Sequence, residues 1–359
     1  MMSGYSEKIC NGLVVNDSCK EGASKSSNDD EREVNDMLQK MSTVDKKDKD
    51  IVSVCANCGK EGNDVNNTCN KCKQVKYCNA VCKKVHKKKH KKDCEEHIRL
   101  AAKKHEEELR LAAEKHDEEL FKQPPPADDC PICFIRMPTM QTGRRYKTCC
   151  GKRICNGCVY APVYDNQGNV VDNKTCPFCR TPLATTDDEI IKREKNRVEA
   201  EDPMAMHQLG LYYRRGMQGL PQDPEKALEL YRRAGDLGNY EAYCTIGLAY
   251  ENGEGVEVDK KTANHYYELA AMGGDADARC NLGINEAKAG NMDKSLKHFM
   301  IAAACGHGSL DNIKDLYSIG VATKEDYTKA LQLYQEYLGE IKSVQRDKAA
   351  ANYENCRYY

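Results

Sequence analysis

Cysteines in close pairs are the residues of this 359-residue sequence best suited to chemistry. Fifteen of its twenty-one cysteines lie between Cys55 and Cys179. Two cysteines separated by two residues present both sulfurs from one tight turn, and a tetrahedral zinc ion is held by two such pairs. No apolar signal segment or membrane-spanning run is visible, so we expect an intracellular, unsecreted protein with reduced cysteines. The pairs therefore indicate metal ligands rather than a disulfide framework.

The first set of ligands runs from Cys55 to Cys94 and reads CANC, CNKC, YCNAVC and HKKDC in chain order. This order resembles the MYND zinc finger, including the tyrosine before the third pair and the closing HxxxC. By that resemblance the pairs interleave around two zinc ions. One ion is bound by Cys55, Cys58, Cys78 and Cys82, and the other by Cys69, Cys72, His90 and Cys94. His86 lies one helical turn before His90 and stays open as an alternative ligand.

This first finger is also strongly basic, with eleven lysines against three acidic residues over 55–94. Electrostatics alone would allow a nucleic-acid partner. Seven thiolates outweigh two zinc ions by three charges, however, so part of the lysine charge compensates the metal sites. Arginine is absent from 55–94 and aromatic residues are scarce, which disfavours nucleic acid. The resemblance to MYND fingers implies a short proline-containing peptide as the partner.

A second set of eight cysteines reads CPIC, CC, CNGC and CPFC over 130–179. It resembles a RING finger of the all-cysteine class. By that resemblance Cys130, Cys133, Cys155 and Cys158 bind one zinc ion, while Cys149, Cys150, Cys176 and Cys179 bind another. The adjacent Cys149 and Cys150 depart from the family pattern, in which at least one residue separates that pair. Lys152 stands where many RING fingers carry a histidine ligand.

The RING resemblance implies ubiquitin ligation without a covalent catalytic residue, because a RING finger acts by positioning a conjugating enzyme and its ubiquitin. Ile132 and Pro177 stand where the family contacts the conjugating enzyme, and Arg180 stands where a basic residue positions ubiquitin. Val159 and Tyr160 extend the same groove. The alternative is that Ile132 and Pro177 only shape the metal-binding turns, that Arg180 is solvated, and that the finger is a binding module.

The segment between the two fingers repeats itself almost letter for letter, as RLAAKKHEEEL at 99–109 and RLAAEKHDEEL at 110–120. An eleven-residue period is about three helical turns, which predicts a helix. Three prolines at 124–126 end it. We interpret 95–123 as a charged helical spacer, since a self-associating coiled coil needs more repeats than two.

From residue 202 the composition changes to Ala, Leu, Tyr and Gly, with a repeat of about 36 residues. The first helices carry LGxxY-like motifs. The second helices place Ala or Ser four residues before an aromatic residue, at 227/231, 263/267, 295/299 and 330/334. This spacing puts a small and a large residue on one helix face, so that neighbouring hairpins interdigitate. The series resembles Sel-one-like repeats, which implies a helical solenoid with a client protein on its concave face.

The sequence therefore predicts a multidomain protein: two small cross-braced α+β zinc fingers joined by a helical spacer, followed by an all-α solenoid. The predicted boundaries are 1–54 (disordered, with free thiols at Cys10 and Cys19), 55–94, 95–123, 127–183, 202–340 and a tail at 341–359. The predicted function is a zinc-binding adaptor, as a RING-type ubiquitin ligase or ligase subunit, with a non-catalytic scaffold as the alternative. Methyltransferase and CxxC redox chemistry are disfavoured. We also expect chelation to unfold 55–180 and to spare the repeats.

Overall fold

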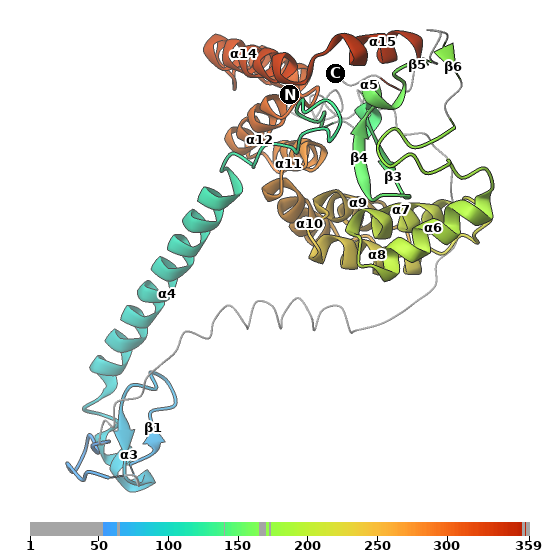
Figure 1. Cartoon of the computed structure of the whole chain (residues 1–359). Helices are drawn as coiled ribbons and strands as arrows, with labels where there is room; N and C mark the ends of the chain where they lie inside the picture. Colours follow the sequence, from blue (N-terminus) through green and yellow to red (C-terminus); the bar gives the residue numbers. More distant parts are fainter. Residues whose placement is uncertain are drawn as a thin grey trace. The chain divides into compact units, whose positions relative to one another are not determined.

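The computed structural model describes residues 53–62, 65–139, 141–164, 170–171, 174–353 and 356 (Figure 1). Cys10, Cys19 and nearly all of the segment 1–54 lie outside these residues. The described chain divides into two compact units, and the division falls between His116 and Asp117 inside helix α4.

The first unit contains the first finger, residues 55–94, and is built from very short elements. Strand β1 (Asn67–Thr68) pairs antiparallel with β2 (Lys76–Tyr77), and helices α3 (Ala80–His86) and α4 (Lys91–Leu120) follow. The side chain of Asn79 accepts a hydrogen bond from the amide of Cys82 and so caps the start of α3. Among the described residues of this unit, the apolar support is a small buried cluster centred on Val65 and Tyr77. Apolar burial alone is therefore too small to hold the finger together.

The second unit begins with the last turn of α4 and continues into the second finger, residues 127–183. A 3₁₀ turn (Gln141–Gly143) leads into an antiparallel hairpin of β3 (Arg144–Lys147) and β4 (Lys152–Cys155). The short helix α5 (Asn156–Val159) follows at once. A second hairpin pairs β5 (Val163–Tyr164) with β6 (Val170–Val171).

The rest of the second unit is helical. Its helices are α6 (Asp187–Glu199), α7 (Pro203–Arg215), α8 (Pro224–Asp236), α9 (Tyr240–Asn252), α10 (Lys260–Met272), α11 (Ala276–Lys288), α12 (Met292–Ala304), α13 (Leu310–Ser318), α14 (Lys324–Ile341) and α15 (Val344–Asn352). Consecutive helices pack in pairs, α7 with α8, α9 with α10 and α11 with α12, and each pair packs on the next. Aspartate side chains accept hydrogen bonds from the first-turn amides of α7, α8, α10 and α11, which fixes where these helices begin. Figure 1 shows the resulting stack of helices.

In three of the helix pairs, a glycine of the first helix lies against an aromatic ring of the second helix. A Cβ atom on Gly210 would lie 2.5 Å from the ring of Tyr231. At Gly247 the equivalent distance to the ring of Tyr267 is 2.5 Å, and Gly283 meets Phe299 at 2.6 Å. The three aromatic side chains are fully buried. Glycine is therefore required at these helix positions because an aromatic ring of the second helix occupies the space of its side chain.

The last turn of α4 is anchored on the solenoid. Arg279 of α11 is buried and donates hydrogen bonds to the carbonyl oxygens of Leu120 and Lys122, which satisfies groups left open at a helix C-terminus. Asp117 forms an ion pair of 2.9 Å with Lys294. Phe121 packs against His298, with ring centroids 4.7 Å apart. The end of the spacer is thus part of the solenoid's packing.

The second finger is also part of this unit. On one side Arg144 and Arg153 pair with Glu241 of α9, and on another side α15 packs against α5. The sequence predicted only a tail over 341–359. Residues 344–352 instead form α15, which Ser343 caps through its hydroxyl group. Among the described helices, none has an eighteen-residue stretch apolar enough to cross a membrane.

Candidate metal centres

Tight turns present the cysteine pairs of both fingers. In four of the five CxxC pairs the residue after the second cysteine has a positive φ and its amide donates to the carbonyl of the first cysteine, whereas Cys155 and Cys158 lie at the start of α5. Gly59 (φ 73°) donates to Cys55 at 2.9 Å, and Lys73 (φ 54°) donates to Cys69 at 3.0 Å. The corresponding residues of the second finger are Phe134 (φ 55°) and Arg180 (φ 63°). Non-glycine residues rarely adopt this conformation, and its recurrence shows that the four turns share one geometry.

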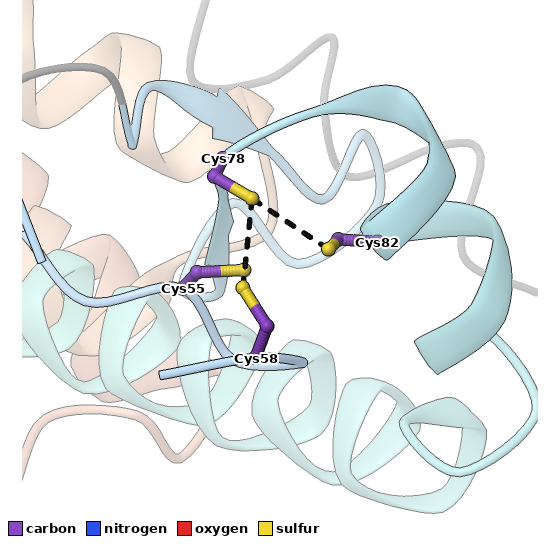
Figure 2. A group of neighbouring side chains, drawn as sticks. All are labelled: Cys55, Cys58, Cys78 and Cys82. Carbon is purple, nitrogen blue, oxygen red and sulfur yellow. Dashed lines mark hydrogen bonds between the residues drawn. The ribbon is translucent and has the colours of Figure 1, made fainter. Parts of the chain in front are cut away.

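The first predicted ligand group comes together as a cluster of sulfur atoms. Figure 2 shows the four side chains converging from two turns and the start of α3. The Sγ atom of Cys78 lies 3.6 Å from that of Cys58 and 3.6 Å from that of Cys82. All four sulfurs lie within 4.8 Å of one another; the group is Cys55, Cys58, Cys78 and Cys82.

The second group of the first finger combines three thiols with an imidazole. Cys69 and Cys94 place their sulfurs 3.8 Å apart, and the Sγ of Cys72 lies 3.3 Å from Nε2 of His90. All four ligand atoms lie within 4.8 Å of one another. His86, the alternative ligand, lies outside this group. Its Nδ1 is instead 3.3 Å from the hydroxyl of Tyr77, and its ring stacks on that of His90.

The eight cysteines of the second finger form two further groups in the predicted interleaved order. One consists of Cys130, Cys133, Cys155 and Cys158, and the other of Cys149, Cys150, Cys176 and Cys179. The Sγ atoms of Cys133 and Cys155 lie 3.8 Å apart, and those of Cys149 and Cys179 lie 3.4 Å apart.

The geometry of the four groups fits zinc. Four sulfurs at about 2.3 Å from a tetrahedral zinc ion lie roughly 3.8 Å from one another. The observed separations of 3.4–3.9 Å agree with this spacing and far exceed a disulfide bond. All these cysteines are free thiols. The donor set of sulfur with one imidazole also suits zinc rather than calcium or magnesium.

The adjacent Cys149 and Cys150 both reach the same group, although they interrupt the usual spacing. They lie in a turn whose amides at Cys150 and Gly151 both donate to the carbonyl of Lys147. Gly151 has a φ of 67°, and a Cβ there would lie 2.8 Å from Asp202 and 2.9 Å from Arg197. The left-handed backbone conformation thus favours glycine, and the turn it permits brings the two neighbouring thiols to one point.

The residues predicted to contact a conjugating enzyme lie in the metal-binding turns of the second finger. Ile132 is half-buried against the cysteine cluster, Pro177 is half-buried, and Arg180 is exposed. Of the two groove residues, Val159 packs on the cluster. The ring of Tyr160 stacks on that of Tyr353 at a centroid distance of 4.3 Å, so the C-terminal segment covers it.

Charged groups from outside the finger hold it in place. Arg144 and Arg153 both pair with Glu241, whose side chain is half-buried. Burial alone would raise the pKa of Glu241, but the two guanidinium groups outweigh that effect and lower it. Tyr146 donates to Asp202 at 2.7 Å, and burial together with this carboxylate raises the pKa of the phenol.

Sequence reasoning missed two groups that touch the ligand sulfurs. The hydroxyl of Thr181 lies 3.2 Å from the sulfur of Cys179. Arg346, at the other end of the chain, lies 3.8 Å from the sulfur of Cys133. Thr181 follows Cys179 by two residues, so its position in the sequence could have suggested this contact. No sequence spacing indicates that Arg346 approaches Cys133.

Two known families match separate parts of the chain. The MYND finger family matches residues 55–94, and the Sel1 repeat family matches 203–239, 241–275 and 315–336. The chain therefore contains a MYND finger, which implies zinc binding, and a Sel1 repeat solenoid. Both are protein–protein interaction modules. No RING match is among these findings, so the class of the second finger is a matter for proposal.

Two curated relatives resemble part of the chain. The "ERAD-associated E3 ubiquitin-protein ligase component HRD3B" of Arabidopsis thaliana is 32% identical over 113 residues, which is 31% of this chain and 18% of that protein. "Chitin synthase regulatory factor 4" of Schizosaccharomyces pombe is 32% identical over 104 residues, which is 29% of this chain and 16% of that protein. The chain thus spans less than a fifth of the length of each relative.

Two solved structures are similar to the helical part of the chain. A Sel1 repeat protein from Oxalobacter formigenes is 29% identical, with 48% of this chain and 68% of that chain covered and a TM-score of 0.36. A protective antigen of uropathogenic Escherichia coli is 28% identical, with 47% and 36% covered and a TM-score of 0.36.

Proposed function

We propose that this protein is a zinc-binding adaptor that acts as a RING-type ubiquitin ligase or ligase subunit. One observation carries the proposal: Cys149, Cys150, Cys176 and Cys179 meet at one point, so that all eight cysteines of the second finger form two interleaved tetrads. This supports a cross-braced finger with two zinc ions over 127–183, beside two in the first finger. The boundaries 55–94, 95–123, 127–183 and 202–340 are proposed with it.

Ligation by such a finger depends on positioning. Zinc supplies no reaction step here and serves to fix the turns that carry the contact residues. Ile132 and Pro177, each inside a CxxC turn, would contact the conjugating enzyme. Arg180 is exposed directly after the last ligand, where its guanidinium can donate hydrogen bonds to ubiquitin and restrict its motion. Holding the thioester in a reactive pose can accelerate transfer to an acceptor amine without a catalytic nucleophile.

The remaining modules would select the client. The MYND finger would bind a proline-containing peptide, and the concave face of the Sel1 repeats would bind a folded client. The Arabidopsis relative is named as a component of a ubiquitin ligase, which favours this assignment for the region that the two chains share. Over that region the similarity supports a role in assembly rather than in the transfer reaction itself.

A ligation assay with the full chain tests the proposal. Purified protein with activating enzyme, ubiquitin and a panel of conjugating enzymes should form ubiquitin chains. Arg180→Ala should lower the rate at least about tenfold, the cost of losing one charge-assisted hydrogen bond, while zinc content stays unchanged. Lys152→Ala removes another exposed basic side chain of the same finger and should keep full activity. No chain formation with any conjugating enzyme would contradict the proposal.

A non-catalytic scaffold is the second candidate, and one observation favours it. Helix α15 packs on α5 and Tyr353 stacks on Tyr160, so part of the proposed groove is covered. If this cover is permanent, the finger is a structural module. Crosslinking and pull-down would then recover stable partners, while the full chain would not discharge ubiquitin from any conjugating enzyme.

A further inference from the structure

Helix α15 packs on the second finger closely enough to exclude a side chain between them. A Cβ atom on Gly157 of α5 would lie 2.8 Å from the backbone nitrogen of Arg346 and 2.9 Å from its Cγ. Gly157 is buried. The absence of a side chain at this position therefore lets the backbone of α15 approach the helix that carries Cys158.

This approach places the guanidinium of Arg346 next to a ligand group. Arg346 is 1% exposed. Its Nη2 donates to the carbonyl of Ile135 at 3.1 Å and lies 3.8 Å from the sulfur of Cys133. Its Nη1 donates to the carbonyls of Arg136 at 2.7 Å and Ile341 at 2.5 Å. One buried side chain thus joins a cysteine, the backbone that follows it and the end of α14.

We propose that Arg346 is a positioning residue for the zinc site formed by Cys130, Cys133, Cys155 and Cys158. This inference rests on the proposed zinc-binding role of the second finger. The site is completed by an arginine that follows Cys133 by 213 residues in the chain. The second finger is then not a self-sufficient module and depends on α15.

Charge and geometry both support this role. Four thiolates around one zinc ion carry a net charge of −2, which is costly to bury without a compensating group. A guanidinium has a delocalised positive charge and a rigid fork of donors, so it can neutralise part of that charge and donate to sulfur and carbonyl oxygen together. By holding the carbonyls of Ile135 and Arg136, it also fixes the segment that follows the first CxxC turn of this finger.

Zinc competition on the full-length protein tests the role of Arg346. A colorimetric zinc chelator is titrated into wild-type protein and into Arg346→Gln, and the released zinc is counted per chain. One equivalent should leave Arg346→Gln at about 10- to 100-fold lower chelator concentration, the usual cost of losing a group that supports a metal ligand. Arg346→Lys keeps the charge but not the fork, and should give an intermediate shift.

Arg279→Gln is the matched control. Arg279 is also a 1% exposed guanidinium that donates to backbone carbonyls, but those contacts lie at the end of α4. This variant should release zinc as the wild-type protein does. It therefore separates support of the metal site from the general cost of losing a buried arginine.

Cobalt substitution gives a second readout that does not depend on activity. In cobalt-loaded Arg346→Lys, the thiolate-to-cobalt absorption of one site should be altered. The reason is that lysine lacks the paired guanidinium donors that orient the Cys133 turn. Overlapping chelator curves and cobalt spectra for wild type, Arg346→Gln and Arg346→Lys would overturn the inference and leave the proposed zinc finger intact. A wild-type chain without zinc at Cys130–Cys158 would overturn both proposals.

Discussion

His298 and Phe121 lie against each other where the last turn of α4 meets α12. His298 is fully buried, and neither ring nitrogen has a hydrogen-bond partner within the part of the chain that the structure describes. Burial lowers the pKa of His298 to about 3, and the positive charges of Arg279 and Lys294 act in the same direction, against Asp117. The imidazole is thus neutral in the folded protein and must stay so for the spacer to remain docked.

The pH dependence of stability follows from this depressed pKa. The unfolded chain takes up the proton near pH 6.5, whereas the folded protein resists it until about pH 3. The stability associated with neutral His298 is therefore complete above about pH 6.5 and is lost as the pH falls toward 3. Between pH 7.5 and 5 the loss amounts to about 2 kcal/mol.

Replacing His298 by leucine should remove this dependence. Urea unfolding at pH 7.5 and pH 5 should show a smaller loss of unfolding free energy for His298→Leu than for the wild type, by about 2 kcal/mol. His265→Leu alters an exposed histidine and should keep the wild-type profile. If the unfolding free energy fell equally between pH 7.5 and pH 5 in all three proteins, His298 would not be the source of the pH dependence.

At the scale of the helical elements, the glycine-to-aromatic contact determines how each repeat closes. Gly247 faces the ring of Tyr267, and that ring also donates its hydroxyl proton to Glu251 at 2.6 Å. A methyl group at Gly247 would require the buried ring or one of the two helices to move. Overpacking of this kind costs about 1–3 kcal/mol.

Gly247→Ala should therefore lower the unfolding free energy by about 1–3 kcal/mol, despite the higher helix propensity of alanine. Gly339→Ala is the matched control, because Gly339 lies on an exposed face of α14 with nothing near its missing Cβ. That control should raise stability by about 0.5–1 kcal/mol. Denaturant titration of both variants checks the pair, and equal effects of the two substitutions would count against the contact.

The repeats show what local periodicity can predict. The predicted small and aromatic pairs at 227/231, 263/267 and 295/299 are all buried, because a helical period places both members on the face that packs. The fourth pair is different: Ala330 is buried, but Tyr337 rather than Tyr334 is fully enclosed, and it packs on Gly306.

The contacts that join distant segments could not be predicted in this way. The eight candidate ligands of each finger lie within about 50 residues and follow a known order, so spacing alone groups them. Arg279, Arg346 and Glu241 contact partners about 90 to 210 residues away. A single sequence contains no periodic signal for such pairs, and a buried arginine is an exception to the usual exposure of charged residues.

At the scale of the whole molecule, the second finger and the solenoid form one compact unit, while the first finger belongs to another. This changes the expectation that chelation unfolds both fingers and spares the repeats. The second finger packs against α9 through Glu241 and against α15 through Arg346. Structural zinc supplies about 10–16 kcal/mol of apparent binding energy in small fingers, so its removal must also affect what packs on the finger.

Hydrogen exchange with and without chelator should show this coupling. After zinc removal, amides of β3, β4 and α15 should lose protection together, while α7–α11 keep most of theirs. Cys72→Ser perturbs a ligand of the first finger only and should leave α15 protected. Full protection of α15 in chelator, with the second finger already exchanging, would show that the two are not coupled.

The close fit of α15 on the second finger also sets an order of events during protein synthesis. Arg346 is encoded 213 residues after Cys133. At a translation rate of roughly 5–20 residues per second, the ribosome reaches this arginine about 10–40 s after the first cysteines of the finger. During that interval the newly synthesised second finger lacks the buried positive charge of Arg346. A message cut short before the codon of Arg346 would therefore yield a chain with both fingers and the described repeats, but without the arginine that completes one of the fingers.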